Sequence, residues 1–207
     1  MEIDIKKENS KNIFLIMAAS FTASAFFQFE LKSISTTTEM FTAGGASLML
    51  SVILVMLANI IPQSVKHKFV FTRIKNELPA CRVDKLCGND HRVEYEKLVN
   101  RWPEVFSQEI DDATRNSRWY KQIYKPVKDE KEVLQAHRSF LLYRDSFSGL
   151  VIIFLGTMIW SLVGNPEIIG EIKPVVLLIQ GVLTILSLIA ARVAGNRFVV
   201  NAVVAAE

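Results

Sequence analysis

A row of cations at helical spacing runs through residues 111–130, the stretch DDATRNSRWYKQIYKPVKDE. The cations recur every three or four residues, which places them along one side of a helix, and aromatic residues are interleaved with them. The cations are Arg115, Arg118, Lys121 and Lys125, and the aromatic residues are Trp119, Tyr120 and Tyr124. Because arginine pairs with phosphate and an aromatic ring stacks on a base, this combination predicts a ligand or partner site.

Two other interpretations of this row stay open. It is also typical of a membrane-surface helix, with arginines on headgroups and aromatic rings at the interface. It can equally be a solvated basic face that opposes acidic residues of a neighbouring helix. The first interpretation assigns contact with a cytoplasmic protein or a nucleotide signal to Arg115, Arg118, Trp119, Lys121 and Lys125. Residues 66–145 hold 17 Lys and Arg against 13 Asp and Glu, an excess too small to indicate nucleic acid.

Small and polar residues recur at spacings of three and four near both ends of the chain. They include Ser20 and Ser24 in the first apolar run, and Gly181, Thr184 and Ser187 in the last. Such residues let helix backbones approach closely in lipid. They predict either helix packing within one chain or a subunit interface or pore lining, and the choice stays open.

Catalytic and metal-binding patterns are weak in this sequence. Cys81, Cys87 and His91 are too loosely spaced for structural zinc, which takes four ligands in tight pairs, and no fourth ligand lies nearby. His67, His91 and His137 form no catalytic set, and neither a nucleophile elbow, a zinc-hydrolase motif nor a phosphate-binding loop is present. We therefore predict no enzymatic activity, no cofactor and no metal.

Four uncharged runs carry or flank the residues named above: 12–29, 40–65, 146–166 and 174–191. A membrane-spanning helix needs about 20 apolar residues, so each run predicts a transmembrane helix. The alternative for the first run is a signal peptide cleaved after Ala23-Ser24-Ala25. The predicted fold is an all-α integral membrane protein with four transmembrane helices. Its segments are 1–65 with helices one and two, a cytoplasmic helical insert at 66–145, and 146–207 with helices three and four and a short tail.

The distribution of Lys and Arg predicts the orientation. Positive residues gather in the N-terminal tail, in the segment 66–144 and after the last apolar run, whereas the two short connectors hold one each, Lys32 and Lys173. Since cytoplasmic loops carry the excess of positive charge, both termini and the insert are predicted to be cytoplasmic. The predicted location is a bacterial inner membrane.

Periodicity predicts that the insert is helical. Tyr95, Leu98, Val99 and Trp102 share one face, and Pro103 then breaks that helix or starts the next. The expected packing face of the following helix is made of Ile110, Ala113, Ser117, Tyr120 and Tyr124, and Pro126 is expected to end it. A last stripe, of Val133, Leu134, His137, Phe140, Leu141 and Arg144, predicts a helix that continues into the third span. The tail at 196–207 is too short to span and is expected to lie along the interface or to pack against the insert.

Three segments resemble small multi-span membrane effector proteins of bacterial anti-phage defence systems: LPACRVDKLCGNDHRVEYEKLVNRWP, DDATRNSRWYKQIY, and RSFLLYRDSFSGL leading into a span. The resemblance implies an antiviral, pore-forming effector in which the insert senses a signal and the membrane helices oligomerise. Apart from Glu30, the four runs carry no ionisable residue, which disfavours proton-coupled transport. The alternative function is a non-catalytic membrane anchor or scaffold whose insert recruits a partner protein.

Overall fold

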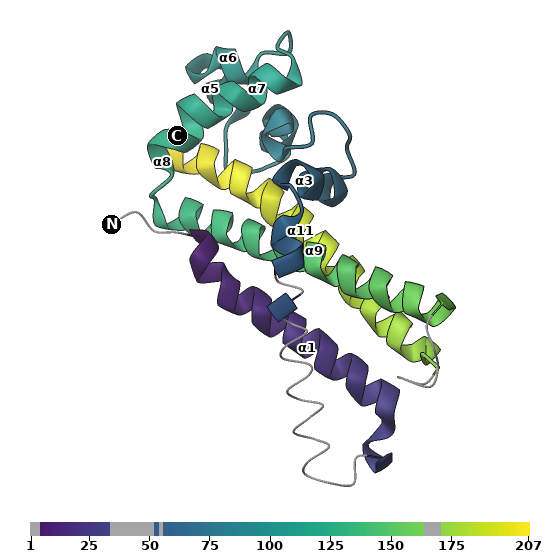
Figure 1. Ribbon diagram of the computed structural model, residues 1–207. Coiled ribbons are helices and arrows are strands. Elements are labelled where there is room, and N and C mark those ends of the chain that lie inside the picture. The colour runs from purple at the N-terminus through teal and green to yellow at the C-terminus, as the bar shows by residue number, and fades with distance from the viewer. Residues whose placement is uncertain (1–4, 34–51, 54–55, 164–170) are drawn as a thin grey trace. The chain divides into compact units, whose positions relative to one another are not determined.

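The computed structural model describes residues 5–33, 52–53, 56–163 and 171–207 (Figure 1). Within these ranges the chain is helical and contains no strand, which confirms the predicted all-α class. In chain order the elements are α1 (Ile5–Ser33), α3 (Gln63–Phe71), the 3₁₀ turn η1 (Pro79–Arg82), α4 (Val83–Gly88), α5 (Tyr95–Arg101), α6 (Pro103–Phe106), α7 (Asp112–Trp119), the π-helix η2 (Tyr120–Tyr124), α8 (Lys125–Val127), α9 (Lys131–Val163) and α11 (Pro174–Ala206).

Three described helices are long and apolar enough to cross a membrane. They are the 20-residue part of α1 at Asn9–Gln28 and the 33-residue helices α9 and α11. The predicted second span, at 40–65, lies largely outside the described residues. As predicted, α9 is one helix from the insert into the third apolar run, and it holds no proline to interrupt it. Pro174 begins α11, where its missing N–H costs nothing.

The described residues fall into two compact units. The membrane unit comprises Met1–Pro62 and Leu142–Ile189, and the insert unit comprises Gln63–Leu141 and Ala190–Glu207. The C-terminal residues therefore group with the insert, which is one of the two expectations for the tail. The predicted tail is the continuation of α11 to Ala206.

The membrane unit is built around a small apolar core between α1 and α9. Ile13 and Met17 from α1 pack with Leu150 and Ile153 from α9. Gly149 permits this close approach, because a Cβ at that position would lie 2.6 Å from the Met17 sulfur. The outer faces of the helices remain apolar and exposed, with Leu162 at 77% and Leu178 at 66%. Such faces suit lipid or another subunit.

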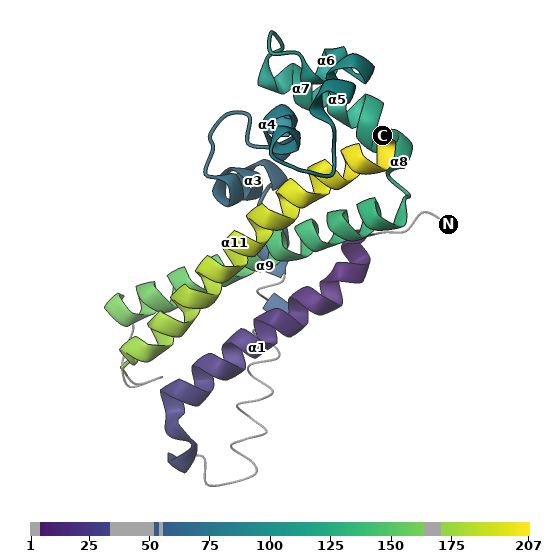
Figure 2. The ribbon, with the colours of Figure 1, turned by 180° about the vertical axis from the view of Figure 1, so that it is seen from behind.

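The insert unit has its own core, to which nearly all of its helices contribute. The side chains of Val83, Leu98, Val105, Ile123, Val133 and Val203 are completely buried. The last turns of α11 belong to this core and come close to α5 (Figure 2). Arg101 of α5 donates a hydrogen bond to the main-chain oxygen of Glu207. Gly195 lets α11 approach the rings of Phe71 and Phe140, because a Cβ there would lie 2.7 Å from the first and 3.0 Å from the second.

The packing face predicted for α7 and η2 is wrong. Ala113, Ser117 and Tyr120 are exposed, and Tyr124 is only partly buried, while the buried side chains are Arg115, Trp119 and Ile123. Hydrophobic periodicity missed this face because an arginine lies at its centre. The roles predicted for the two prolines agree better with the structure. Pro103 starts α6, and Pro126 lies in the last short helix, which ends at Val127.

Candidate functional site

The cation row of the insert divides into buried and exposed members. Arg115 and Trp119 are only 4% exposed, whereas Lys121 and Lys125 are exposed and Arg118 is partly so. The two buried side chains therefore hold the insert together in this structure. Of the five predicted contact residues, Arg118, Lys121 and Lys125 remain on the surface for a partner.

Arg115 connects four segments of the insert unit. Its guanidinium donates hydrogen bonds to the main-chain oxygens of Val105 at 3.1 Å, Ser107 at 3.0 Å and Cys81 at 3.4 Å. It also donates to Asp112 at 3.0 Å and lies 3.6 Å from Asp84. A buried charge is tolerated only when it is paired and hydrogen-bonded, and every guanidinium nitrogen of Arg115 donates at least once. We call this arrangement the Arg115 clamp.

The Asp111 side chain starts the helix that carries the clamp. Its carboxylate accepts a hydrogen bond from the Thr114 N–H at 2.9 Å, as an N-cap residue does. This hydrogen bond lowers the pKa of Asp111. Asp112 follows in the first turn and Arg118 lies in the last, an order that complements the helix dipole.

Trp119 lies in an aromatic cluster that joins three helices of the insert unit. Its ring stacks on Tyr124 at 5.6 Å and meets the edge of Phe198, from α11, at 5.7 Å. His137, from α9, stacks on Phe198 at 4.6 Å, and its Nδ1 lies 3.1 Å from the Tyr124 hydroxyl. Burial raises the pKa of Tyr124, which keeps the hydroxyl protonated and able to donate. The cluster connects the cation row to the insert ends of both long helices.

Sequence reasoning missed the π-helix that carries part of the row. At η2 the Lys125 N–H reaches back to the Tyr120 oxygen, five residues earlier. Pro126 supplies a physical reason, because its ring would clash with the carbonyl of Gln122 in a regular α-helix. A wider turn before the proline relieves that clash. π-turns inside helices occur often at functional sites, and they offer a place where helical register can change.

The predicted small-residue stripe of the membrane unit contains a hydrogen-bonded contact between α1 and α11. Ser24 Oγ donates to the Ser20 main-chain oxygen at 2.9 Å, and Gln180 Nε2 donates to Ser24 Oγ at 3.0 Å. Gln180 is 2% exposed, Ser20 3% and Ser24 6%. Within the described part of the chain, two atoms of this contact, Ser20 Oγ and Gln180 Oε1, have no hydrogen-bond partner. We call these three residues the polar seam.

The other members of the predicted stripe serve their own helix. Thr184 Oγ1 donates to the Gln180 main-chain oxygen at 2.7 Å, and Ser187 Oγ donates to that of Thr184 at 2.8 Å. Gly181 faces the ring of Phe154, which lies 3.6 Å from the position of a Cβ. Ser20 and Ser24 are thus in the seam, and Gly181 provides a close helix contact.

A buried ion pair in the membrane unit escaped the sequence prediction. Arg144 and Asp145 are both 3% exposed, and the arginine donates two hydrogen bonds of 3.1 Å to the carboxylate. The signal was available, since both charges directly precede the third apolar run. Arg144 was expected on the packing stripe of the insert, but it belongs to the membrane unit. Charged pairs at such positions mark functional sites more often than exposed pairs do.

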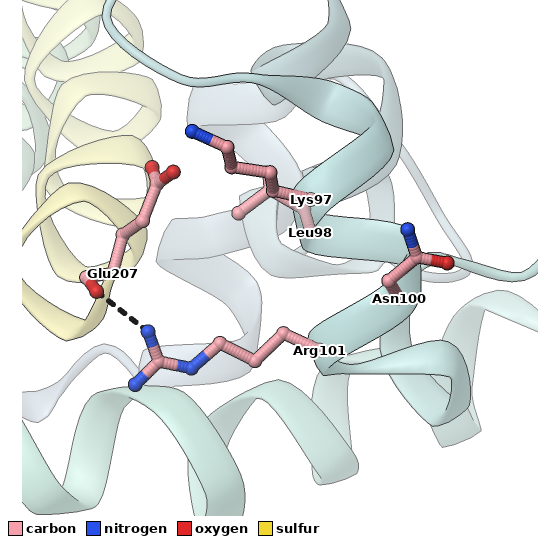
Figure 3. Close-up of a pocket in the computed structure, with 5 residues that line it drawn as sticks. All are labelled: Lys97, Leu98, Asn100, Arg101 and Glu207. Carbon is pink, nitrogen blue, oxygen red and sulfur yellow. Dashed lines mark hydrogen bonds between the residues drawn. The ribbon is translucent and has the colours of Figure 1, made fainter.

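An open pocket of about 510 Å³ lies in the insert unit between α5 and the end of α11 (Figure 3). It is lined by Lys97, Leu98, Asn100, Arg101 and Glu207. Lys97 pairs with Glu94 at 2.9 Å, and Arg101 donates to Glu207. Both cations of the pocket are therefore already engaged, and the pocket is best explained as a contact between two helices.

The two cysteines are poor ligands and poor nucleophiles. Both are buried and unpaired, and burial raises the pKa of Cys87 to about 12 and that of Cys81 in the same direction. At neutral pH these thiols stay protonated, whereas metal binding and nucleophilic attack need the thiolate. In the described part of the chain, no group of three or more His, Cys, Asp and Glu residues is placed to hold a metal ion.

The chain matches no protein-family model, no curated protein and no solved structure.

Proposed function

We propose that this chain is an inner-membrane effector of bacterial anti-phage defence. It oligomerises and permeabilises or depolarises the membrane when the insert receives a signal. The observation that supports the proposal is the polar seam, a set of buried polar atoms between α1 and α11. Two of these atoms, Ser20 Oγ and Gln180 Oε1, have no hydrogen-bond partner among the residues that the structure describes.

An unpartnered polar atom buried in an apolar environment costs about 1–3 kcal/mol. Ser20 Oγ can donate and Gln180 Oε1 can accept, so water or the polar group of another subunit would satisfy both. If α1 moves against α11 and water or a second copy enters, these two atoms can form the hydrogen bonds that they lack in the closed packing. The rearrangement is then favoured by the free energy of those hydrogen bonds. A pore needs such a second arrangement of the same helices.

The insert supplies a route for the signal. Arg118, Lys121 and Lys125 are accessible on the segment that contains the π-helix, and the aromatic cluster ties that segment to His137 of α9 and Phe198 of α11. A partner that binds the cations and prefers another register of the π-helix would shift the cluster. α11 carries both Phe198 of the cluster and Gln180 of the seam, so a shift of the cluster would be transmitted along this helix to the seam.

The exposed cations support a second candidate function, a membrane scaffold without a pore. In that case the insert recruits an acidic partner, and the seam only fixes helix packing. Charge reversal of Arg118, Lys121 and Lys125 would abolish co-purification of the partner under both functions. Ser20→Leu or Gly181→Leu would abolish toxicity and leave partner binding intact only if the chain is an effector.

The experiment that separates the two is a measurement of membrane potential with a voltage-sensitive dye. The chain is overexpressed in bacteria, alone and together with the products of its neighbouring genes. Depolarisation in either condition is the result that we expect of an effector. An intact potential in both conditions, with the chain inserted in the membrane, would contradict the effector and favour the scaffold.

A further inference from the structure

The loop that follows α3 presents cations and large apolar side chains together on the surface of the insert unit. Lys68, Arg73 and Lys75 are exposed, Phe69 is 62% exposed, and Ile74 is 83% exposed. Single exposed apolar residues are common on protein surfaces, but two large ones beside three cations give this loop the composition of a membrane-surface segment.

Backbone hydrogen bonds hold this loop in a defined shape. The Arg73 N–H bonds to the Lys68 oxygen at 3.2 Å and the Thr72 N–H to the Phe69 oxygen at 3.4 Å, which closes the end of α3. Thr72 has a φ of 49°, a left-handed conformation that a β-branched residue rarely adopts. Its hydroxyl lies 3.0 Å from Arg192 of α11, which helps to hold it. The backbone that leads to Ile74 therefore has a defined conformation, in which the Ile74 side chain is exposed.

The loop holds one acidic residue, Glu77, against the three cations, so its charge is positive on balance. None of the ion pairs in the part of the chain that the structure describes includes Lys68, Arg73 or Lys75. Arg82 adds a fourth cation, because the nearby charge of Arg73 contributes, after burial, to lowering the pKa of Arg82. Its guanidinium lies over the Phe71 ring at 5.7 Å, and its buried Nη1 has no hydrogen-bond partner in the described ranges. Clustered arginines with an unused donor are a setting in which phosphate binds.

The position of the loop in the chain indicates that the phosphate belongs to a lipid headgroup. α3 begins at Gln63, in the last residues of the apolar run 40–65 that predicts the second span, and continues into the basic segment that follows it. Basic segments beside a membrane-spanning helix are attracted to anionic lipid, and an apolar or aromatic side chain among them inserts at the boundary of headgroups and acyl chains.

We propose that Lys68, Arg73, Lys75 and Arg82 bind the headgroup phosphates of anionic phospholipids, with Phe69 and Ile74 inserted beside them. This site is separate from the candidate signal surface on α7, η2 and α8, and it does not depend on pore formation. It anchors the insert unit to one class of lipid, so the lipid composition of the membrane would influence the unit that receives the signal.

The test uses the full chain in lipid nanodiscs, with an environment-sensitive fluorophore on Ile74→Cys. The natural cysteines are 3% and 1% exposed, so labelling is selective for the new one. Discs of phosphatidylcholine are compared with discs in which phosphatidylglycerol is increased stepwise. We expect a blue shift of the emission that grows with the anionic lipid, and none for a label on Asn89→Cys, an exposed position after α4.

Charge variants decide whether the site is specific. Lys68→Gln, Arg73→Gln and Lys75→Gln together should raise the phosphatidylglycerol fraction for the half-maximal shift by at least about fivefold, since each cation near an anionic surface contributes about that factor. Lys85→Gln, Lys128→Gln and Lys131→Gln remove the same charge from other exposed positions and should leave the response unchanged.

Three results would overturn the proposal. They are equal emission in both kinds of disc, equal loss of the response in the two triple variants, or suppression of the shift by soluble glycerol phosphate, which would indicate a site for free phosphate. None of these readouts uses membrane potential. Failure of this proposal is therefore distinguishable from failure of the effector function.

Discussion

The Arg115 clamp of the insert unit and the polar seam of the membrane unit are both buried polar contacts between helices, but they are satisfied to different degrees. Arg115 donates to three main-chain oxygens and to Asp112. In the seam, Gln180 donates one hydrogen bond to Ser24, and its own oxygen and the Ser20 hydroxyl receive none.

The difference indicates which contact can change. Breaking the Arg115 clamp would leave several buried polar groups without hydrogen bonds at once. Opening the seam would instead let its two unpartnered atoms form hydrogen bonds. We infer that the insert unit behaves as a firm body around the clamp and that the membrane unit contains the element with two arrangements.

The largest effect is expected from Arg115→Met. The substitution leaves three main-chain oxygens without their donor and Asp84 without its cation, which should destabilise the insert unit by about 3 kcal/mol. The measurement is chemical denaturation of the detergent-solubilised chain, followed by tryptophan fluorescence. Arg118→Met is the control on the same helix, and because Arg118 is more exposed it should lose less than about 1 kcal/mol. Equal losses in both variants would refute the clamp.

The next effect is expected where α11 meets the aromatic rings of the insert unit. The Cβ of Gly195→Ala would lie 2.7 Å from Phe71 and 3.0 Å from Phe140, so overpacking should destabilise the unit by about 1–3 kcal/mol. Gly156→Ala is the matched change in α9, where nothing lies within 4 Å of the new carbon, and it should be neutral or slightly stabilising. Thermal unfolding of the two variants side by side measures the difference. A tolerated Gly195→Ala would show that this part of the insert unit is loose.

The smallest effect is expected at the surface of the insert unit. Arg92 pairs with Asp90 at 2.9 Å and donates to Asn201 of α11 at 3.0 Å. The hydrogen bond from Arg92 lowers the pKa of Asp90 to about 2, below its ordinary value of 3.8. The stabilisation is therefore present above the ordinary pKa and is lost as pH falls from about 4 towards 2.

Unfolding of the wild-type chain and of Asp90→Asn across this pH range measures that contribution. The two should differ at neutral pH and converge near pH 2. A constant difference across the range would mean that the ionisation of Asp90 does not stabilise the unit.

The long elements were predictable because their signals are long. The apolar runs at 12–29 and 174–191 lie in α1 and α11, and residues 146–163 of the third run lie in α9. Pro174 and Pro103 start helices where their rings favour it. The continuation of α11 into the insert unit was harder to predict. The run NRFVVNAVVAAE is too short to span, and only tertiary packing shows that Phe198, Val199 and Val203 are core residues.

The site was predicted less well, for reasons visible in single residues. Arg115 lies at helical spacing with exposed cations, and no local pattern reveals that three carbonyls from other segments surround it. Tyr120 and Tyr124 look like a packing face, but the π-helix at 120–124 changes the register after Trp119. The stripe of small residues correctly marked Ser20 and Ser24. Its partner Gln180 stood out as a polar group in the last run, but its contact with Ser24 depends on which helices meet.

The most direct test of the proposed role of the polar seam is the membrane potential of cells that express Gln180→Leu. This change removes the unpartnered oxygen and the hydrogen bond to Ser24, while Ser24 keeps its bond to the Ser20 oxygen, so folding should change by less than about 1 kcal/mol. Thr184→Val is the control one turn along α11, because Thr184 bonds only to its own helix. We predict that the dye reports depolarisation for the wild-type chain and for Thr184→Val, and little or none for Gln180→Leu at equal membrane abundance. Full depolarisation by Gln180→Leu would contradict the account, because the seam would then be packing alone.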